Sequence, residues 1–266
     1  MGLAVCATPI GNMDDVTLRV LAELREADVV LAEDTRRTGL LLARHKIDAK
    51  LLSYHEHNEA ARVTELLPRL EAGERVALVS DAGLPGVSDP GARLVRAALD
   101  AGVAVTVLPG PSAVETALVS SGLVSDRYAF VGFLPRRAAE LRALWDELAS
   151  WRWPVVAFES AQRLPLSLRS LATYAPERDV VVCRELTKQF EEVVRGSAAE
   201  LAERFEDPPR GEITVVFGPG PEASRRDEAE SAVASLVAAG TPRKVAAEIV
   251  SGLTGESRNE LYREGL

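Results

Sequence analysis

The chain contains little of what a secreted, metal-binding or membrane protein needs. Only two cysteines occur among its 266 residues, Cys6 and Cys183, and each lies inside an apolar, strand-like run. Their separation is typical of neither a disulfide framework nor a metal site, so we expect two buried thiols in a reducing compartment. No apolar run approaches the ~18 residues that span a bilayer, and residues 1–15 lack the basic and apolar regions of a signal peptide. We therefore expect a cytoplasmic protein with no membrane partner.

A basic surplus is also missing. Lys and Arg number 31 against 40 Asp and Glu, which leaves a net charge of −9 at pH 7. A protein that coats nucleic acid without sequence preference needs clustered Lys and Arg to neutralise phosphates. The charge argues against that class of protein, but an enzyme that meets one RNA site through a local basic patch stays compatible with it.

Several common catalytic and nucleotide-binding motifs are absent as well. No Gly-x-Gly-x-x-Gly follows the first predicted strand, and the sequence has neither a Walker lysine motif nor an HExxH zinc motif. His55 and His57 form the one histidine cluster, and the third histidine is His45. Two histidines separated by one residue rarely bind a metal without further ligands, so no metal site is predicted. With Asn58, they are interpreted either as substrate contacts or as solvated loop residues.

The chain does have a regular alternation of short apolar runs and helix-period stretches. Strands are predicted at residues 3–7, 28–32, 50–53, 75–80 and 103–108, and in a second series at 128–132, 154–159, 179–184, 191–195 and 212–217. After the first of them, Val16, Val20, Leu21 and Leu24 recur at helical spacing. Such alternation predicts an α/β fold with a mostly parallel sheet and helices on both faces.

Breaks in this pattern divide the chain into three predicted parts. A weakly structured stretch at residues 122–127 separates the two strand series, and the breaker cluster Gly218-Pro219-Gly220-Pro221 follows the last strand. Beyond it, helices are predicted at residues 227–239, 242–252 and 258–264. We therefore predict an α/β domain at residues 1–121, a second α/β domain at 122–220 and a small helical appendage at 221–266.

Three loops follow predicted strands and open helices. In an open parallel sheet, such loops lie at the carboxyl edge, where ligands bind. The first loop is residues 8–12, and Asp14 or Asp15 is expected to cap the helix that follows it. In the third loop, residues 109–113, Ser112 and Glu115 have capping-box spacing. That segment predicts a helix start whose free backbone N–H groups also face a cleft.

The second loop, residues 80–91, is richer in glycine and proline than a turn requires. It holds three glycines and two prolines, and glycine permits positive φ and the close approach of a ligand to the backbone. Asp89 and Pro90 are predicted to be the N-cap and the first residue of a helix. Asp81 comes directly after the strand, where a carboxylate can accept hydrogen bonds from ligand hydroxyls or amines. For Asp81 we therefore favour a binding role over a structural one.

Together with other segments, these loops resemble the tetrapyrrole-methylase-like family, and within it the bacterial 16S rRNA (cytidine-2′-O)-methyltransferases. The resemblance covers nearly the whole chain. Apart from loop 80–91, it rests on the segments ATPIGN (7–12), AEDTR (32–36), SYHEHNE (53–59), PGPSA (109–113), GFLPR (132–136), RELTK (184–188) and GEITVV (211–216). Residues 243–262 look like the helix-turn-helix-like tail of this branch.

The resemblance implies two α/β domains of the tetrapyrrole methylase type, with S-adenosylmethionine as the cofactor in the cleft between them, usually in a homodimer. It also implies an activity, the 2′-O-methylation of a cytidine ribose in 16S ribosomal RNA at the decoding site of the small ribosomal subunit. Leu84 stands where this branch usually has threonine. If a hydroxyl acts at that position in the family, cofactor affinity is in question here.

The resemblance also assigns residues to the site by position. The cofactor-binding residues would be Pro9, Ile10, Asp81, Leu84, Ser112 and Ala113, closed from the second domain by Glu159, Leu186 and Glu212. The substrate side would include Glu33, Asp34, Arg36, His55, His57 and Asn58. Candidate phosphate contacts are Arg36, Arg37, Arg136, Arg137 and Lys188.

The implied reaction is an in-line attack of a ribose 2′-oxygen on a sulfonium methyl, for which positioning supplies much of the rate. The hydroxyl must still lose its proton to a base, and Glu33, Asp34 and His55 are the candidates, in no order. Capping of a helix at residues 35–45 is the alternative role for the two carboxylates. Two other functions stay open, a small-molecule tetrapyrrole methylase and a non-catalytic ribosome-binding protein on this scaffold. The polar segments 33–37 and 55–58 and the helical tail favour RNA.

Overall fold

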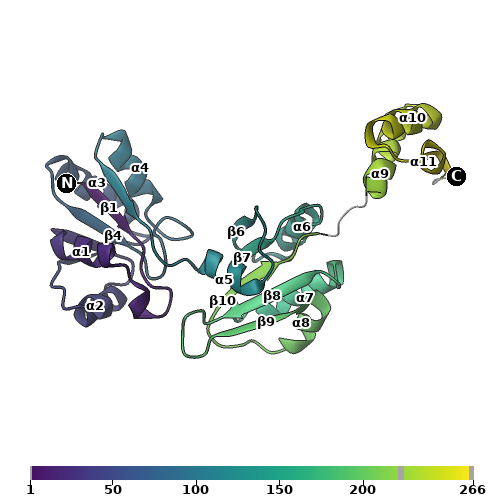
Figure 1. Cartoon of the computed structure of the whole chain (residues 1–266). Coiled ribbons are helices and arrows are strands. Elements are labelled where there is room, and N and C mark those ends of the chain that lie inside the picture. The colour runs from purple at the N-terminus through teal and green to yellow at the C-terminus, as the bar shows by residue number, and fades with distance from the viewer. Residues whose placement is uncertain (1, 221–224, 264–266) are drawn as a thin grey trace. The chain divides into compact units, whose positions relative to one another are not determined.

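The computed structural model describes residues 2–220 and 225–263 (Figure 1). The chain divides into two compact units. One consists of Met1–Arg142 and Trp153–Gly218 and holds both β-sheets, and the other consists of Ala143–Arg152 and Pro219–Leu266. No helix among the described residues is long and apolar enough to cross a membrane.

The first sheet has five parallel strands in the order β3-β2-β4-β1-β5. Its strands are β1 (Leu3–Cys6), β2 (Val29–Ala32), β3 (Leu51–Ser53), β4 (Val76–Val79) and β5 (Val105–Leu108), and its helices are α1 (Leu18–Glu26), α2 (Thr35–Arg44), α3 (Glu59–Glu71) and α4 (Ala92–Asp100). All five strands predicted for this part of the chain are confirmed. Each strand is connected to the next through a helix, as parallel pairing requires. Because all five strands are parallel, their carboxyl ends lie at the same edge of the sheet.

Helices cover both faces of this sheet, as predicted (Figure 1). Successive side chains of a strand point to opposite faces. Leu3 of β1 therefore packs with Leu66 of α3 and Leu94 of α4, whereas Cys6 packs with Leu21 of α1 on the other face, together with Leu42 of α2. The predicted buried thiols are also confirmed, because Cys6 and Cys183 are both fully buried and unpaired.

The second sheet has the order β6-β7-β10-β8-β9 and is mainly antiparallel. Its strands are β6 (Ala129–Phe133), β7 (Val155–Ser160), β8 (Asp179–Arg184), β9 (Glu192–Ser197) and β10 (Glu212–Phe217). Only β6 and β7 pair in parallel within it. The prediction of mostly parallel pairing is therefore wrong here, although all five strands are confirmed. Residues 185–191 between β8 and β9 contain no helix, and a parallel pair needs a crossover of a dozen residues or more.

One helix packs on the second sheet from a position before the predicted domain boundary. It is α5 (Ala113–Ser121), whose Val114, Ala117 and Leu118 share an apolar cluster with Val156 and Val181 of the sheet. The other helices in this part of the chain are α6 (Ala138–Leu148), α7 (Leu164–Tyr174) and α8 (Ala198–Arg204). The division of the chain at residues 121 and 220 stays a prediction.

The predicted tail helices are present as α9 (Arg225–Ala238), α10 (Arg243–Thr254) and α11 (Arg258–Arg263). They share an apolar cluster that includes Val233, Val250 and Leu261. Helix α10 ends at Gly255, whose φ of 79° is the left-handed conformation that glycine adopts at helix ends. Pro221 of the breaker cluster and Glu264 of the last predicted helix lie outside the described residues.

Two predicted helix starts are wrong. Thr17, not Asp14 or Asp15, caps α1, because a short 3-10 turn over Met13–Asp15 comes first and delays the helix. Helix α4 begins at Ala92 rather than at Pro90, because the loop continues through Gly91 with a φ of 140°. Asp89 is therefore not an N-cap, and its carboxylate is left for another role.

The contrast between two leucines of α4 tests the packing of the first sheet. Leu94 is fully buried, whereas Leu99 is 56% exposed. We expect Leu94→Ala to lower the free energy of unfolding by about 2–5 kcal/mol, because a cavity remains in the core, and Leu99→Ala to change it by less than about 0.5 kcal/mol. Urea denaturation of both variants measures the difference. Equal losses would contradict the packing of α4 on this face.

Candidate functional site

A cavity of about 160 Å³ lies at the carboxyl edge of the first sheet. It is lined by Thr8, Pro9, Ile10, Gly11, Met13, Arg37, Thr38, Leu40, Leu41, Ser80, Asp81, Ala82 and Lys188. The first two loops are joined beside it by backbone hydrogen bonds, from Thr8 N–H to the Gly83 carbonyl (2.8 Å) and from Gly83 N–H to the Thr8 carbonyl (3.0 Å). The Thr8 hydroxyl also donates to the Ser80 carbonyl at 2.9 Å. These bonds hold the two loops as one rigid wall.

The segment between β8 and β9 closes this wall from the second sheet. The Asn12 N–H donates to the Thr187 hydroxyl at 3.0 Å. A Cβ at Gly11 would lie only 2.5 Å from Lys188 Cγ and 2.7 Å from Thr187 Oγ1, so only glycine fits there. Thr187 itself has a φ of 65°, an uncommon conformation for a residue with a branched side chain. Such backbone strain persists only where the surrounding contacts enforce it.

Both cations on the cavity wall are paired with carboxylates. The Arg37 guanidinium lies 3.4 Å from Asp81 Oδ2 and 3.7 Å from Glu212 Oε1. Lys188 Nζ lies 2.9 Å from Glu212 Oε2 and 2.9 Å from Glu185 Oε1. Glu212 therefore joins the two cations, and the chain of ion pairs links the loop after β4 to the second sheet.

Two carboxyl groups near the cavity, those of Asp89 and Glu33, have raised pKa values. Burial raises the pKa of Asp89 to about 6, and the neighbouring charges of Glu33 and Asp81 act in the same direction. Burial and the charge of Asp81 also raise the pKa of Glu33, against the opposing charges of Arg37 and His55. A cluster of like charges with one shared cation binds a proton more readily than an isolated carboxylate.

Asp34 has a different environment from Glu33, although the two are adjacent in the sequence. Its carboxylate accepts hydrogen bonds from the Arg36 N–H at 2.9 Å and from the Arg36 guanidinium at 2.7 Å, so Asp34 caps α2. These bonds hold the pKa of Asp34 far below its usual value. Its own N–H donates to Asp81 Oδ1 at 2.9 Å. The alternative role that the sequence left open, capping of this helix, is therefore the one that Asp34 has in the structure.

Asn58 organises the segment that holds the two histidines. Its amide oxygen accepts the His55 N–H at 2.9 Å, and its amide nitrogen lies 3.2 Å from both the Ser53 carbonyl and His55 Nε2. The exposed His57 ring meets His55 edge to face, with centroids 5.9 Å apart. Since the charge of His55 acts on Glu33, the ends of β2 and β3 bring these two side chains into one neighbourhood.

The structure distributes the predicted cofactor residues over four environments. Pro9, Ile10 and Asp81 line the cavity. Ala113 and Leu186 pack in the apolar cluster that contains Ile10. Glu212 joins the cations of the cavity wall. Leu84 packs into the core of the first sheet, so its side chain acts there as an apolar filler.

Ser112 and Glu159 lie outside the cavity wall. Helix α5 does begin after Ser112, but the predicted capping box is wrong, because the Ser112 hydroxyl donates to the Glu115 carboxylate and makes no capping bond to the backbone. Glu159 is 2% exposed and accepts hydrogen bonds from Ser160 N–H (2.6 Å) and the Ser167 hydroxyl (2.5 Å). It also pairs with Arg163, so its carboxylate is fully engaged within the second sheet and α7.

The predicted phosphate contacts fall into two groups. Arg37 and Lys188 line the cavity. Arg36, Arg136 and Arg137 are exposed on the surface, where Arg36 pairs with Asp34 and Arg137 pairs with Glu140 at 3.0 Å.

Several residues of the wall were missed at the level of sequence. Thr8 and Met13 lie beside the predicted residues Pro9 and Ile10 in the sequence, and this closeness was the one signal that could have identified them. Leu41 lies four residues after Arg37 and three after Thr38 on α2, spacings that bring Leu41 next to each of them on the helix surface. Asp89 is predicted as a helix cap, whereas in the structure it is partly buried near Glu33 and Asp81. Burial by segments distant in the sequence is not visible in a local pattern.

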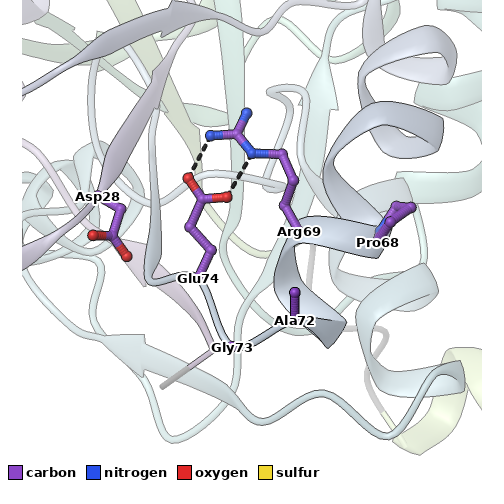
Figure 2. A pocket seen from close by; sticks show the side chains of 6 residues that line it. All are labelled: Asp28, Pro68, Arg69, Ala72, Gly73 and Glu74. Carbon is purple, nitrogen blue, oxygen red and sulfur yellow. Dashed lines mark hydrogen bonds and ion pairs between the residues drawn. The ribbon is translucent and has the colours of Figure 1, made fainter.

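A second hollow lies at the opposite, amino edge of the first sheet (Figure 2). It has a volume of about 570 Å³ and is lined by Asp28, Pro68, Arg69, Ala72, Gly73 and Glu74. Figure 2 shows Arg69 and Glu74 joined by two hydrogen bonds, and Asp28 accepts the Arg75 N–H at 2.8 Å. Its charged groups are thus committed to structural contacts, and the loops at the carboxyl edge remain the candidate site.

Comparison with known proteins assigns the family. The model of tetrapyrrole (corrin/porphyrin) methylases matches residues 2–202. Two relatives, from Micromonospora olivasterospora and Thermotoga maritima, are both named ribosomal RNA small subunit methyltransferase I. The first is 43% identical over 98% of this chain and 85% of its own length, and the second is 45% identical over 81% of this chain and 97% of its own.

Solved structures share the fold at lower identity. The uroporphyrin-III C-methyltransferase of Thermus thermophilus, in complex with S-adenosyl homocysteine, aligns with a TM-score of 0.58 at 21% identity, over 82% of this chain and 97% of that one. The methyltransferase CobJ aligns with a TM-score of 0.62 at 20% identity, over 82% and 94%. The chain belongs to the tetrapyrrole (corrin/porphyrin) methylase family, in the branch of its relatives named ribosomal RNA small subunit methyltransferase I.

The environment of Asp89 predicts a pH dependence of stability. A carboxyl whose pKa is raised on folding, here to about 6, binds its proton more tightly in the folded state. Its contribution to stability is therefore present at low pH and is lost as pH rises through that value. We expect Asp89→Asn to gain roughly 1–2 kcal/mol relative to wild type between pH 5 and pH 8. Denaturation at both pH values measures this, with the exposed Asp48→Asn as control. Parallel behaviour of the two variants would contradict it.

Proposed function

We propose that the chain uses S-adenosylmethionine to methylate the ribose 2′-oxygen of a cytidine at the decoding site of 16S ribosomal RNA. The observation that carries the proposal is the match over nearly the whole chain to relatives named as ribosomal RNA small subunit methyltransferases. The joined loops and the cavity at the carboxyl edge of the first sheet supply the site. A cytoplasmic homodimer acting on the small ribosomal subunit is the form proposed for it.

The residues of the cavity fit the proposed cofactor. The Asp81 carboxylate on the wall can accept hydrogen bonds from hydroxyls and favours a nearby positive charge. Ile10 lines the same cavity as an apolar side chain and packs in one cluster with Ala113 and Leu186. When bound, S-adenosylmethionine supplies a methyl group activated by a sulfonium. Leu84, where this branch usually has threonine, is partly buried and packs against the sheet core.

Of the two adjacent carboxylates, we propose Glu33 rather than Asp34 as the base. Its raised pKa brings the carboxylate closer to the neutral range in which a general base works best. Asp34 is held as an anion by Arg36 and already caps α2, which makes it a weak proton acceptor. In the proposed reaction, Glu33 would accept the proton of the ribose 2′-hydroxyl, and S-adenosylmethionine held beside Asp81 would supply the methyl group.

RNA contact by an acidic protein requires local positive charge. Arg36, Arg136 and Arg137 are exposed. The ion pairs of Arg36 with Asp34 and of Arg137 with Glu140 lie at the surface, where such pairs are weak enough for a phosphate to displace the carboxylate. Arg37 and Lys188 are paired with Asp81, Glu212 and Glu185, so a phosphate would have to replace a carboxylate. We infer that the exposed arginines make the first contact.

Methyl transfer to small ribosomal subunits that lack the modification tests this function. We expect labelled S-adenosylmethionine to transfer its methyl group, and nucleoside mass spectrometry to identify 2′-O-methylcytidine. Subunits that already carry the modification serve as the control. A methylated base would refute the ribose assignment. Cofactor binding without any transfer to the subunit, together with transfer to a porphyrin-type substrate, would favour a small-molecule methylase. No cofactor binding in calorimetry would favour a non-catalytic ribosome-binding protein.

Asp81 provides a first test of the cofactor site. Asp81→Asn keeps an acceptor for the Asp34 N–H but removes the charge. We expect the affinity for S-adenosylmethionine to fall about tenfold, since a hydrogen bond to a charged group contributes roughly 1.5–3 kcal/mol. Calorimetry measures the dissociation constant, and circular dichroism checks the fold. An unchanged dissociation constant would remove Asp81 from the cofactor site.

The base is tested by two neighbouring substitutions. We expect Glu33→Gln to lower kcat by about 10²–10⁴, the usual contribution of a general base, without a matching change in the cofactor dissociation constant. Asp34→Asn should cost much less, because asparagine also caps helices well. Single-turnover methylation of small subunits measures both rates. The reverse order of effects would assign the base to Asp34.

A further inference from the structure

Helix α4 follows loop 80–91 and has no N-terminal cap of its own. A helix start leaves backbone N–H groups without partners inside the helix, and Ser, Thr, Asp or Asn usually satisfies one of them. Here the cap position is Gly91, with a φ of 140° and no side-chain cap. A Cβ there would lie 2.9 Å from Leu78 Cδ2, so none of the usual capping residues fits. The free N–H groups need acceptors from elsewhere in the chain.

The segment after β3 supplies an acceptor at this helix start. The Gly91 N–H donates to Glu59 Oε1 at 3.0 Å. The Tyr54 hydroxyl donates to the same Glu59 oxygen at 2.9 Å, and Arg93 approaches the other Glu59 oxygen at 3.7 Å. A carboxylate from one segment, held by a neighbouring tyrosine, thus caps a helix that belongs to another segment.

Burial makes this arrangement durable. Tyr54 is 1% exposed and the Glu59 side chain is 14% exposed. Burial and the bond to Glu59 hold the pKa of Tyr54 well above its ordinary value, so the phenol keeps its proton and remains a donor. The Glu59 carboxylate lies at the N-terminal ends of both α3 and α4, where helix dipoles favour negative charge.

The contact connects the two sides of the proposed active site. One end of loop 80–91 is fixed by Thr8 through Gly83, and the other end is fixed by Glu59 at Gly91. Between Tyr54 and Glu59 in the chain lie His55 and Asn58, which belong to the predicted substrate side. Any displacement of this segment therefore moves the end of the cofactor-side loop as well.

We propose that Tyr54 and Glu59 are a positioning pair: Glu59 caps α4 from outside, and Tyr54 holds the Glu59 carboxylate in place. The pair thereby holds loop 80–91 in its binding conformation and couples it to the substrate-side segment. The role of the loop in binding S-adenosylmethionine rests on the proposed function. The capping itself does not, because it follows from the contact of Gly91 with Glu59.

Four variants separate this role from a general loss of stability. Glu59→Ala removes the acceptor, and Glu59→Gln keeps an oxygen that can accept from both Gly91 and Tyr54. Tyr54→Phe removes only the hydroxyl. Glu71→Ala, at the exposed end of the same helix α3, is the control. For each we would measure hydrogen exchange of residues 80–95, the dissociation constant of S-adenosylmethionine, and kcat with small subunits.

We expect Glu59→Ala to speed exchange in residues 80–95 and to weaken cofactor binding about tenfold, as the loss of one buried, charge-assisted acceptor predicts. Glu59→Gln should restore binding to within about threefold of wild type, and Tyr54→Phe should fall between the two. Glu71→Ala should match wild type. If Glu59→Ala does not fold, faster exchange of residues 80–95 in Tyr54→Phe, against an unchanged rest of the chain, still supports the pair.

Wild-type exchange and binding in Glu59→Ala, or equal effects of Glu59→Ala and Glu71→Ala, would overturn the proposal. If the proposed function is wrong, the measurements give a different set of results. If the wild-type protein binds S-adenosylmethionine but does not methylate subunits, exchange and binding still decide the role of the pair. If it binds no S-adenosylmethionine, the hydrogen exchange alone decides whether Glu59 holds the loop.

Discussion

The paired backbone hydrogen bonds between Thr8 and Gly83 are the contact on which the site depends. They join the loop after β1 to the loop after β4, whose strands are already neighbours in the sheet. Gly83 can make this contact because its φ of 82° turns the backbone toward Thr8. The bond from the Thr8 hydroxyl to Ser80 then fixes the strand end, and Asp81 follows at once. The position of the Asp81 carboxylate is therefore set by backbone geometry more than by its own ion pair.

Charge in this site is arranged around carboxylates. Glu33, Asp81 and Asp89 lie within reach of one another, and Arg37 is shared between Asp81 and Glu212. Repulsion among the acids and partial burial shift proton affinity upward at Glu33 and Asp89, whereas the local bond to Arg36 shifts it downward at Asp34. The adjacent residues Glu33 and Asp34 thus have pKa values shifted in opposite directions. The proposed roles, proton acceptor for Glu33 and helix cap for Asp34, follow from that difference.

Much of the fold was predictable because it is encoded by local patterns. All ten strands follow from short apolar runs, the tail helices follow the breaker cluster after the last strand, and the parallel first sheet follows from its crossover helices. The antiparallel pairing of β8 and β9 was missed, because periodicity reports strands but not their partners. The caps at Thr17 and Gly91 were missed for another reason. In both places a turn was inserted before the helix, and the residue that looked like a cap belonged to that turn.

The candidate site was predictable only where a residue acts at its own position in the chain. Asp81 comes shortly after strand β4, and that placement alone indicated its location on the wall. Glu59 is the first residue of α3, yet its oxygen also serves α4, more than thirty residues further along the chain. Such a role arises from the parallel order of β2, β3 and β4, which brings the loops after these strands to one edge. The same topology lets Glu59 accept the Gly91 N–H at the start of α4, where glycine offers no capping side chain. A helix that begins beside another segment can be capped by a side chain of that segment. The position of loop 80–91 then depends on the position of the segment that carries Glu59.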